Sequence, residues 1–530
     1  MKQIVPLIQK RITHRNLILF GLLLMAIGLP LSAFLMSLGQ FVLLGNWIIE
    51  GKWKDKWDRI SKKKWFFFLL LFYFLHVVGM LWSEDFEYGI KDLRIKLPLF
   101  LMPLLLFTSE PIKENELKII LRLFVASVLI STLVSLFVFV GFTKHKVVDT
   151  REISIFISHI RLSLMVVLSC LLLLLNKLEV KKTVSVIVFL WFVFFLFLLE
   201  SLTGILILIA VLLLLVLYLG YSRKNKVMVV SIFSVLVSVL LFVSYVFISE
   251  WKKLKYDCTK TPNQKYCFET PGKRRYFNDF KSQERENGNL VWTCIQIEEL
   301  REGWNKRSKV NFDSMGHAKN PIASTIIRYL ASKGQKKDSS ALAQLSQDEI
   351  TSVENGVTNF KYKDPGSIRS RIHEALWEYQ KYQSGGDPTG HSLLMRIEFW
   401  RCAARVICNH LVFGAGTGDV KQELDRQYEK DNTRLPKAWR LRSHNQFFTT
   451  TVGLGIIGGL LLLLFFAIPF LTQKKPETIF VFFMCIVFLS MLNEDTLETQ
   501  AGVTFFSFFY FLLLRFSTSS RVEDNYRASI

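Results

Sequence analysis

Residues 441–459 read LRSHNQFFTTTVGLGIIGG and lead without a break into the apolar run LLLLLFFAIPFLT at residues 460–472. A few polar residues come first, and a long, mostly apolar segment follows. Such a segment is long enough to cross the roughly 30 Å hydrocarbon core of a bilayer as one helix. His444 and Asn445 therefore stand at the water edge of a predicted membrane helix, which indicates a polar site presented by a membrane protein.

A second informative stretch lies upstream, where residues 395–420 read MRIEFWRCAARVICNHLVFGAGTGDV. Arg396 and Trp400 are four residues apart and share one face of the helix that this stretch predicts. The helix ends in the glycine-rich turn GAGTGD. This turn lacks the Lys-Ser/Thr of a phosphate-binding P-loop and the spacing of a dinucleotide fingerprint. We interpret it as a scaffold turn that lets a helix pack closely.

The composition excludes an ordinary soluble globular protein, because 51% of the 530 residues are hydrophobic and 46 are phenylalanine. Runs such as LRLFVASVLISTLVSLFVFVGF, residues 121–142, are longer than buried core segments and long enough to span a membrane. We predict an all-α polytopic membrane protein with about twelve transmembrane helices and no cleavable signal peptide. The spans are expected near residues 16–32, 34–50, 65–82, 96–108, 119–142, 158–176, 183–199, 201–221, 227–249, 446–472, 477–493 and 501–517.

Orientation follows from lysine and arginine, which favour the cytoplasmic side of a membrane protein. They are dense before the first span and in every second connection, as in residues 51–64. The last connection of the opposite side carries only acidic charges, Glu494, Asp495 and Glu498. This alternation requires the short span at 96–108. It predicts that both termini lie in the cytoplasm and that the large polar insert lies outside.

The predicted domains are a membrane domain of about nine spans (1–249), an outer loop domain (250–443), three further spans (444–517) and a cytoplasmic tail (518–530). The insert is far longer than a plain connection. Within it, SIRSRIHEALWEYQKYQSGG (residues 367–386) has apolar residues at helical spacing and ends in two glycines. We therefore predict a large, mostly helical periplasmic loop that carries part of the active site.

Three cysteines, Cys258, Cys267 and Cys294, lie in this insert, which is predicted to face an oxidising compartment. The spacing CTKTPNQKYC would allow a disulfide between Cys258 and Cys267. Unpaired cysteines are the alternative, and the sequence leaves both open. No second Cys or His pair has the spacing of zinc ligands.

Several residues are candidates for chemistry. His444 could take a proton from a sugar hydroxyl, or be an interfacial histidine that only hydrogen-bonds a lipid headgroup. Arg396 could bind phosphate oxygens in bidentate fashion, or extend toward lipid headgroups. Arg161 and His159 open the sixth span from the outer side and could point at the same site. His76, inside the third span, is interpreted as a buried hydrogen-bonding group.

These motifs resemble a known family. His444-Asn445, followed by nine residues and Gly455-Ile-Ile-Gly458, is similar to the signature of bacterial O-antigen ligases. Arg396, Trp400 and GAGTG are similar to the wider O-antigen ligase/polymerase domain superfamily. Three further segments resemble a branch of that family with an enlarged outer loop: SHIRLSL (158–164), YLASKG (329–334) and GHSLLMR (390–396).

The resemblance implies a metal-independent glycosyltransferase with a GT-C-like fold and no cofactor. Such an enzyme takes a glycan from undecaprenyl pyrophosphate and joins it to lipid A–core, on the outer side of the bacterial inner membrane. The family histidine corresponds to His444, and an expected arginine is replaced here by Leu202. The resulting assignment is the following: His444 and Arg396 catalytic; Arg161, Asn445, His159, Arg442 and Trp400 substrate-binding; no metal ligand.

The residues themselves agree with this class of reaction. A formal net charge of +22 suits an anionic lipid-linked donor, a phosphorylated acceptor and membrane lipids, and we expect no nucleic-acid partner. Two alternatives remain. A polymerase would join lipid-linked repeat units to one another. A transporter of lipid-linked glycans would place charged residues at the bilayer midplane, where these spans carry almost none.

Overall fold

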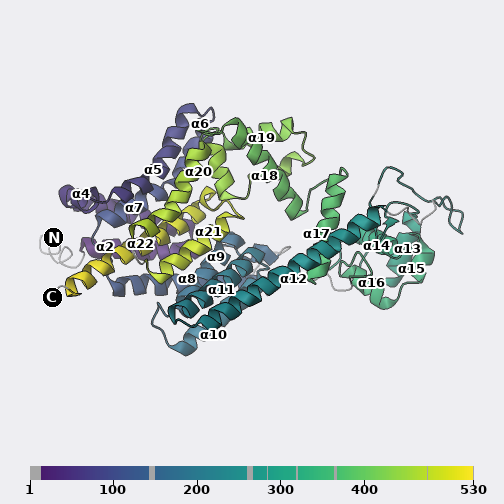
Figure 1. The fold of residues 1–530 in the computed structure, drawn as a ribbon, viewed down its shortest axis with the longest axis horizontal. Helices are drawn as coiled ribbons and strands as arrows, with labels where there is room; N and C mark the ends of the chain where they lie inside the picture. The colour runs from purple at the N-terminus through teal and green to yellow at the C-terminus, as the bar shows by residue number, and fades with distance from the viewer. Residues whose placement is uncertain are drawn as a thin grey trace. The chain divides into compact units, whose positions relative to one another are not determined.

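The computed structural model describes residues 13–142, 150–259, 267–282, 284–317, 320–362, 367–473 and 476–528. The chain divides into two compact units. The membrane unit comprises residues 1–225 and 396–530, and the insert unit comprises residues 226–395. Both are built almost wholly of helices (Figure 1), and the sheet found in the described residues has two strands. The predicted all-α fold class is confirmed.

Membrane-spanning character is clear from helix length and composition. Among the described residues, eight helices are long and apolar enough to cross a membrane, so the protein is a multi-pass membrane protein. In the membrane unit these are α2 (His14–Leu31), α3 (Ala33–Glu50), α5 (Lys64–Val78) with η1 (Gly79–Trp82), α8 (Glu114–Phe139), α11 (Leu202–Ser222), α20 (Gln446–Thr472) and α22 (Gln500–Ala528); in the insert unit, α12 (Lys226–Thr259). Three shorter apolar helices are α9 (His159–Leu174), α10 (Lys182–Leu198) and α21 (Thr478–Met491).

The fourth predicted span differs from the expectation. It corresponds to α7 (Pro98–Thr108), whose 11 residues extend only about 16 Å, roughly half of the hydrocarbon thickness. α6 (Phe86–Lys96) precedes it directly, and the intervening Leu97 keeps helical angles, with φ −51° and ψ −34°. Pro98 interrupts the hydrogen bonding because it lacks an N–H group. α7 alone is therefore too short to cross the membrane, and the polar α6 precedes it.

Part of the evidence for orientation lies outside the described residues, namely the lysines and arginines at positions 1–12 and at 474–475. The remaining elements of the membrane unit are connections and surface helices. They are α4 (Trp53–Ser61), η2 (Thr150–Ile153), α18 (Ser392–Asn409, of which residues from 396 belong to this unit), α19 (Val420–Lys430), η3 (Lys437–Trp439) and η4 (Thr496–Glu498).

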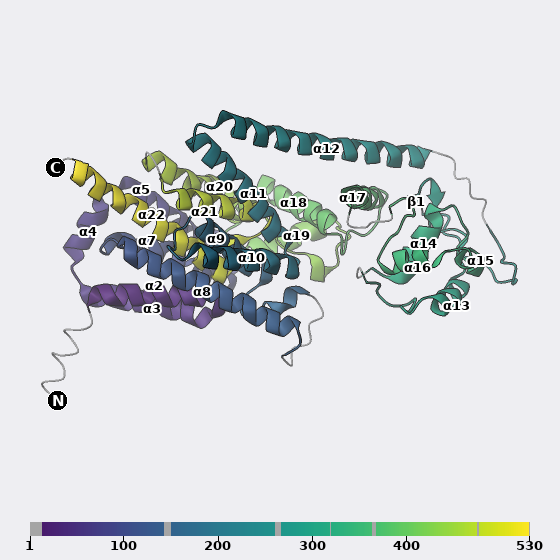
Figure 2. The ribbon, with the colours of Figure 1, turned by 90° about the horizontal axis from the view of Figure 1, so that it is seen from below.

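α22 is the central helix of the membrane unit and packs against α7 and α21 (Figure 1 and Figure 2). Its aromatic side chains are almost completely buried, including Phe505, Phe508 and Tyr510. The hydroxyl of Tyr510 donates to the backbone carbonyl of Phe465 in α20 at 2.7 Å. Buried aromatic rings of this kind account for much of the packing energy of a core. They hold α20, α21 and α22 together, and with them the connections between these helices.

α20 is interrupted at Gly455, whose φ of 64° and ψ of −167° are not helical. The glycine-rich turn after α18 fills the interruption. Three backbone hydrogen bonds join the two segments: Ala415 N–H to Val452 C=O (2.8 Å), Gly416 N–H to Gly453 C=O (2.9 Å) and Ile456 N–H to Leu411 C=O (2.8 Å). A Cβ atom on Gly455 would lie 2.1 Å from the Val412 carbonyl oxygen. The interpretation of the turn as scaffold is confirmed.

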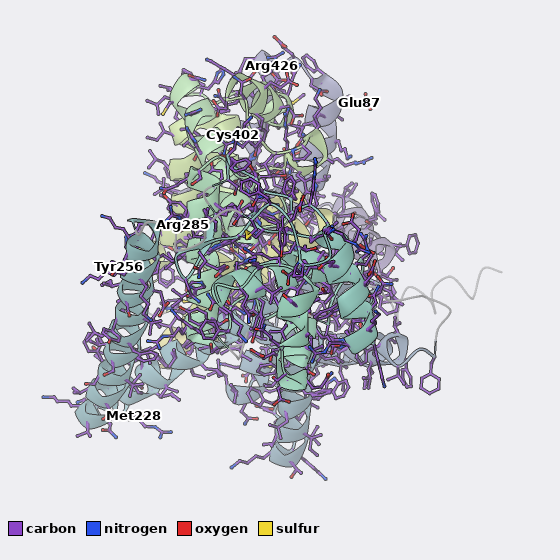
Figure 3. The ribbon with its side chains drawn as sticks, turned by 90° about the vertical axis from the view of Figure 1, so that its right-hand side faces the viewer. Glu87, Met228, Tyr256, Arg285, Cys402 and Arg426 are labelled. Atoms are coloured by element: carbon purple, nitrogen blue, oxygen red, sulfur yellow. A yellow bond between two sulfur atoms is a disulfide. The ribbon has the colours of Figure 1, made fainter. Side chains whose placement is uncertain are left out.

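The insert unit has its own core, centred on buried Trp304, Ile326, Leu330 and Ile350. Its elements are α12, β1 (Arg285–Glu286), β2 (Asn289–Leu290), α13 (Ile297–Arg307), α14 (Ile322–Ser332), α15 (Ser339–Ala343), α16 (Gln347–Glu354) and α17 (Ile368–Gln383). Met228 and Tyr256 mark the two ends of α12 in Figure 3. The C-terminal part of α12 packs on α17 through Leu254, Leu376 and Trp377.

One disulfide crosslinks the insert unit, and it is not the one that the cysteine spacing would allow. Cys267 is bonded to Cys294, 27 residues further along the chain. This pairing excludes a bridge between Cys267 and Cys258, whose side chain lies outside the described residues. The backbone explains the choice, because Phe277 and Ile295 exchange hydrogen bonds and bring the two segments together.

Candidate functional site

The connection between α21 and α22, residues 493–499, lies at the centre of the candidate site. It contains η4 and three carboxylates, Glu494, Asp495 and Glu498, all of them buried. A buried carboxylate is costly unless it is paired or hydrogen-bonded. The partners come from α6, α9, α18 and the start of α20. They include most of the residues that the sequence predicted for the site.

His444 lies beside this connection. Its Nδ1 is 3.7 Å from the Glu494 carboxylate, and its backbone N–H donates to Asp495 at 3.2 Å. The Glu494 carboxylate raises the pKa of His444, against the opposing effects of burial and of the Arg396 charge. The residue has a φ of +49°, a left-handed conformation that is rare for a residue with a side chain and is found at functional sites more often than elsewhere.

Asn445, the next residue, is the N-cap of α20. Its side-chain oxygen accepts from the Phe448 N–H at 3.2 Å, and its side-chain amide donates to the Leu492 carbonyl at 3.0 Å. These bonds attach the beginning of α20 to the end of α21. Asn445 thus fixes the backbone next to His444, whichever substrate contacts it also makes.

Arg442 belongs to a buried network of two cations and two carboxylates. It donates to Glu498 at 2.9 Å and to the Tyr88 hydroxyl. Lys96 donates to the same Glu498 at 3.1 Å and to Asp92 at 2.6 Å. Burial alone would raise the pKa of Glu498, but the charges of Lys96 and Arg442 outweigh it and lower the value to about 2. The network links α6 to η4.

The two ends of the Arg-x-x-x-Trp motif on α18 contact the site differently. Arg396 donates to the side-chain oxygen of Asn493, and the amide of Asn493 donates to Thr203 at 3.2 Å. Trp400 donates through its indole N–H to the backbone carbonyl of Ser443 at 3.0 Å. Trp400 therefore holds the residue that directly precedes His444.

Arg161, in α9, contacts the connection formed by residues 493–499. Its guanidinium donates to the backbone carbonyl of Asp495 at 2.9 Å and to the Thr499 hydroxyl at 3.4 Å, while Nη1 has no hydrogen-bond partner. The residue is 6% exposed. His159 lies half-buried two residues earlier, at the first position of α9.

The position of the missing family arginine does not point into the site. Leu202, the first residue of α11, is 68% exposed. Its neighbour Thr203 accepts the hydrogen bond from Asn493 and so belongs to the contacts of Arg396. His76 hydrogen-bonds the Phe72 carbonyl at 2.9 Å and is buried, as its interpretation as a structural group predicts.

A small cavity of about 20 Å³, large enough for a water molecule, adjoins the charged network. Its lining combines α6, the glycine-rich turn, α20 and η4: Tyr88, Asp92, Lys96, Thr417, Thr449 and Glu498 are among the residues that face it. The charged network is therefore closely packed and leaves little empty space.

Five of the residues that the sequence predicted for the site all contact residues 492–499 in the structure. They are His444, Asn445, Arg442, Arg396 and Arg161. Sequence reasoning missed the acidic connection itself, and the Lys96 and Asp92 pair with it. A signal was present. Three carboxylates in a short connection, directly after an apolar helix, are an unusual charge density for a membrane edge.

The comparison with known families agrees with this geometry. Residues 342–463 match the family model described as O-antigen ligase. The chain therefore carries an O-antigen ligase domain. The match runs from α15 into the second half of α20 and includes Arg396, Trp400, the glycine-rich turn and His444. No curated protein matches the chain significantly.

The matched O-antigen ligase domain indicates the general class of function. It is that of a glycosyltransferase-like ligase or polymerase, acting on lipid-linked glycans and lipid acceptors in a bacterial membrane. Several parts of the candidate site lie outside the matched range, among them Asp92 and Lys96 of α6, Arg161 and residues 493–499. The structure brings them to the matched residues through the contacts described above.

Proposed function

We propose that this protein transfers an O-antigen-type polysaccharide from undecaprenyl pyrophosphate to lipid A–core on the periplasmic side of the bacterial inner membrane. The family match supports the general class. The observation that carries the proposal further is the convergence of His444 and Arg396 on residues 493–499, at the N-terminal edge of a membrane helix. A base and a cation are what this metal-independent transfer needs.

His444 is the proposed general base. Its Nδ1 faces Glu494, so the neutral ring keeps a proton on this nitrogen and leaves Nε2 free to accept one. The acceptor hydroxyl gives its proton to Nε2 while its oxygen attacks the anomeric carbon of the donor. The bond from that carbon to the pyrophosphate breaks in the same step, and the pyrophosphate stays on the lipid. Glu494 stabilises the imidazolium that forms.

Arg396 is the proposed ligand of the leaving pyrophosphate. Its described side-chain partner is a neutral amide, that of Asn493, so a carboxylate does not neutralise its charge by a hydrogen bond. Arg442, in contrast, is engaged with Glu498. A guanidinium suits two phosphate oxygens at once, and stabilising the developing charge lowers the barrier to departure.

The other predicted substrate-binding residues support the same site. The observed contacts of Arg161 favour a role in positioning residues 495–499. Trp400 and Asn445 hold the backbone on both sides of His444. His159 remains a candidate for contact with the acceptor.

A polymerase is the second candidate, because the family itself includes both activities. Both would use the same donor and the same base, and they differ in the acceptor. A transporter is less well supported, since the central parts of the described apolar helices carry almost no charged residues.

The lipopolysaccharide ladder of a deletion strain tests the proposal. We expect loss of all polymer on lipid A–core, with polymer retained on the lipid carrier, and restoration by the wild-type gene. Single repeat units capped onto the core would instead identify a polymerase. An unchanged ladder would refute both.

A further inference from the structure

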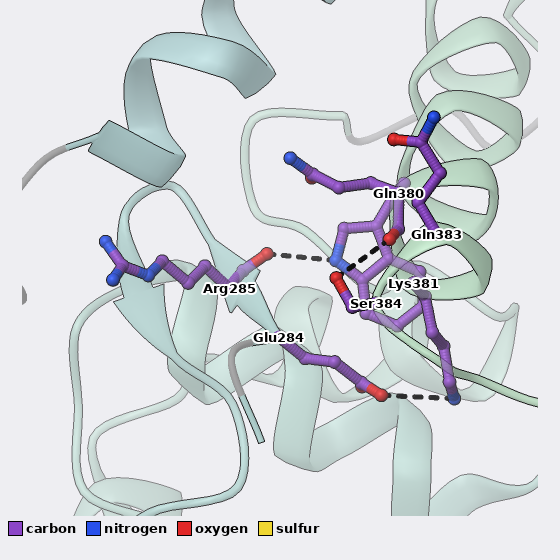
Figure 4. Close-up of a pocket in the computed structure, with 7 residues that line it drawn as sticks. Glu284, Arg285, Gln380, Lys381, Gln383 and Ser384 are labelled. Carbon is purple, nitrogen blue, oxygen red and sulfur yellow. Dashed lines mark hydrogen bonds and ion pairs between the residues drawn. The ribbon is translucent and has the colours of Figure 1, made fainter. Parts of the chain in front are cut away.

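The insert unit has a groove that the proposed reaction does not use (Figure 4). It has a volume of about 300 Å³, at the lower end of the range of about 300–1,000 Å³ typical of ligand pockets. One side is the C-terminal end of α17, with Gln380, Lys381, Gln383 and Ser384. The other side is the chain at the start of β1, with Glu284 and Arg285.

The floor of the groove is rigid. Trp377 forms it and is 5% exposed. Its indole N–H donates to the Arg285 carbonyl at 2.9 Å, and the Arg328 guanidinium lies 3.6 Å from its ring centroid. Arg328 is in turn held by Glu286 at 2.7 Å and Glu374 at 2.7 Å. A floor fixed in this way loses little conformational entropy when a ligand binds.

The charges that line the groove are balanced. Lys381 Nζ lies 3.5 Å from Glu284 across the groove, and the other oxygen of Glu284 accepts from Trp292 at 2.6 Å. The guanidinium of Arg285 points away from α17 in Figure 4, so this residue contributes its backbone. A site for phosphate or another strong anion would need a surplus of cations. This groove has none among its described residues.

The remaining lining groups are amides and a hydroxyl, those of Gln380, Gln383 and Ser384. Within the protein, the Gln383 amide donates to the Tyr379 hydroxyl and the Ser384 hydroxyl donates to the Gln380 carbonyl, each at 3.1 Å. The Gln383 amide keeps a second N–H and its oxygen, and the Ser384 oxygen can still accept, so these groups can pair with sugar hydroxyls, which also donate and accept. The methylene stem of Lys381 adds apolar surface for the C–H faces of a sugar ring. An extended peptide would require a free strand edge or apolar pockets instead.

We propose that this groove is a binding site for sugar residues of a neutral or weakly charged polysaccharide. The inference rests on the proposed function only in taking the transferred glycan as the ligand. The groove binds the growing or finished chain through sugars other than those at the linkage that reacts. It therefore favours long donors over short ones without taking part in the chemistry.

Direct binding tests the proposal without any transfer. The full chain carrying His444→Ala, in lipid nanodiscs, is titrated with free polysaccharide released from the lipid carrier of the same bacterium by mild acid. We expect saturable binding. Gln380→Ala with Gln383→Ala should weaken it about 10-fold, since each lost hydrogen bond is worth roughly a few-fold in affinity. Ser384→Trp, which fills the mouth from an exposed position, should weaken it at least as much.

Gln344→Ala is the matched control, because Gln344 is an exposed glutamine of the same unit that does not line the groove. Unchanged affinity in both groove variants would overturn the inference, as would equal loss in the control. Displacement of a bound unstructured peptide, without binding of polysaccharide, would also overturn it. Polysaccharide binding in this assay, together with an unchanged lipopolysaccharide ladder in the deletion strain, would refute the proposed reaction and leave the groove assignment standing.

Discussion

At the scale of single residues, the site is built from carboxylates that pair with histidine, arginine and lysine side chains. Glu494 faces His444, and Glu498 faces both Arg442 and Lys96. The first pair is suited to proton transfer because histidine changes charge near neutral pH. The second set is suited to holding a backbone in place, because its charges cancel and all its members are largely buried.

The pair of Glu494 and His444 predicts a pH effect. Glu494 raises the pKa of His444, and only the neutral imidazole accepts a proton, so wild-type activity should rise with pH through that raised value. Glu494→Gln removes the charge and should move this rise to lower pH, with a lower rate on the alkaline plateau. A pH profile of transfer by the purified variant measures both. If the pH profile of Glu494→Gln does not shift, Glu494 does not control the protonation of His444.

Glu498 predicts a stability effect. Its pKa is lowered to about 2, so its stabilising contribution is complete above the ordinary glutamate value of about 4.3 and is lost as pH falls toward 2. Glu498→Gln leaves Lys96 and Arg442 without their shared carboxylate and should cost about 3–5 kcal/mol at neutral pH. The thermal midpoint of the purified protein should fall. Below pH 4 the difference in thermal midpoint between Glu498→Gln and the wild type should become smaller.

Glu84→Gln serves as its control. Glu84 pairs with Arg426 at 3.2 Å, but both side chains are more than half exposed, and such pairs contribute little. An equal loss of stability in both variants would contradict the role of the buried network.

The sequence predicted the residues of this site unevenly. His444 and Arg396 could be predicted, because each belongs to a sequence motif next to a predicted membrane helix. Asp495 and Glu498 were not, because their partners Thr449, Arg442 and Lys96 stand 46, 56 and 402 residues away. A local sequence pattern cannot predict contacts between residues so far apart along the chain.

At the scale of elements, the broken helix α20 is the feature that positions the site. The break at Gly455 receives the glycine-rich turn after α18, and the same turn binds the start of α6. There the Asp419 carboxylate accepts the N–H groups of Glu84 and Asp85 at 2.8 Å each. α6, α18 and α20 all carry site residues. Their relative placement therefore depends on close backbone contact.

Gly455→Ala tests this arrangement. A Cβ atom would meet the Val412 carbonyl oxygen at 2.1 Å, and the residue already has a positive φ, so the variant should lose both stability and transfer. Gly45→Ala is the matched control in α3, where nothing lies within 4 Å of the added atom. Thermal melting and the lipopolysaccharide ladder of complemented strains measure the two effects. Normal melting and normal transfer in Gly455→Ala would contradict the account.

Element boundaries were predictable where apolar runs are long, and less so where they are short. The run at 119–142 corresponds closely to α8 (Glu114–Phe139). The run at 96–108 did not reveal that a polar helix, α6, directly precedes α7, because the buried residues of α6, Asp92 and Lys96, are charged and belong to the network at η4. Gly455 stands in an uninterrupted apolar run, so the break in α20 has no signal in hydropathy.

At the scale of the whole molecule, topology decides whether donor and acceptor reach the site. The positive-inside pattern predicts that residues 250–443 lie outside and both termini inside. A reporter fused after Ser340 should be active outside, and one fused after Ser61 should report the cytoplasm. Without reductant, Cys267 and Cys294 should resist thiol labelling in cells, since they form a disulfide, while exposed Cys408 reacts. A cytoplasmic signal from Ser340 would overturn the proposed reaction.

The most direct test of the central claim is the maximal transfer rate of His444→Ala at rising acceptor concentration. General-base help is typically worth about 100- to 10,000-fold, so the maximal rate should fall by this order even when acceptor is saturating. His410→Ala is the control, because His410 also lies near a carboxylate, 3.5 Å from Glu423, but outside the site. It should keep the wild-type rate. Recovery of the normal maximal rate by His444→Ala at saturating acceptor would show that His444 only binds substrate, and would contradict the account.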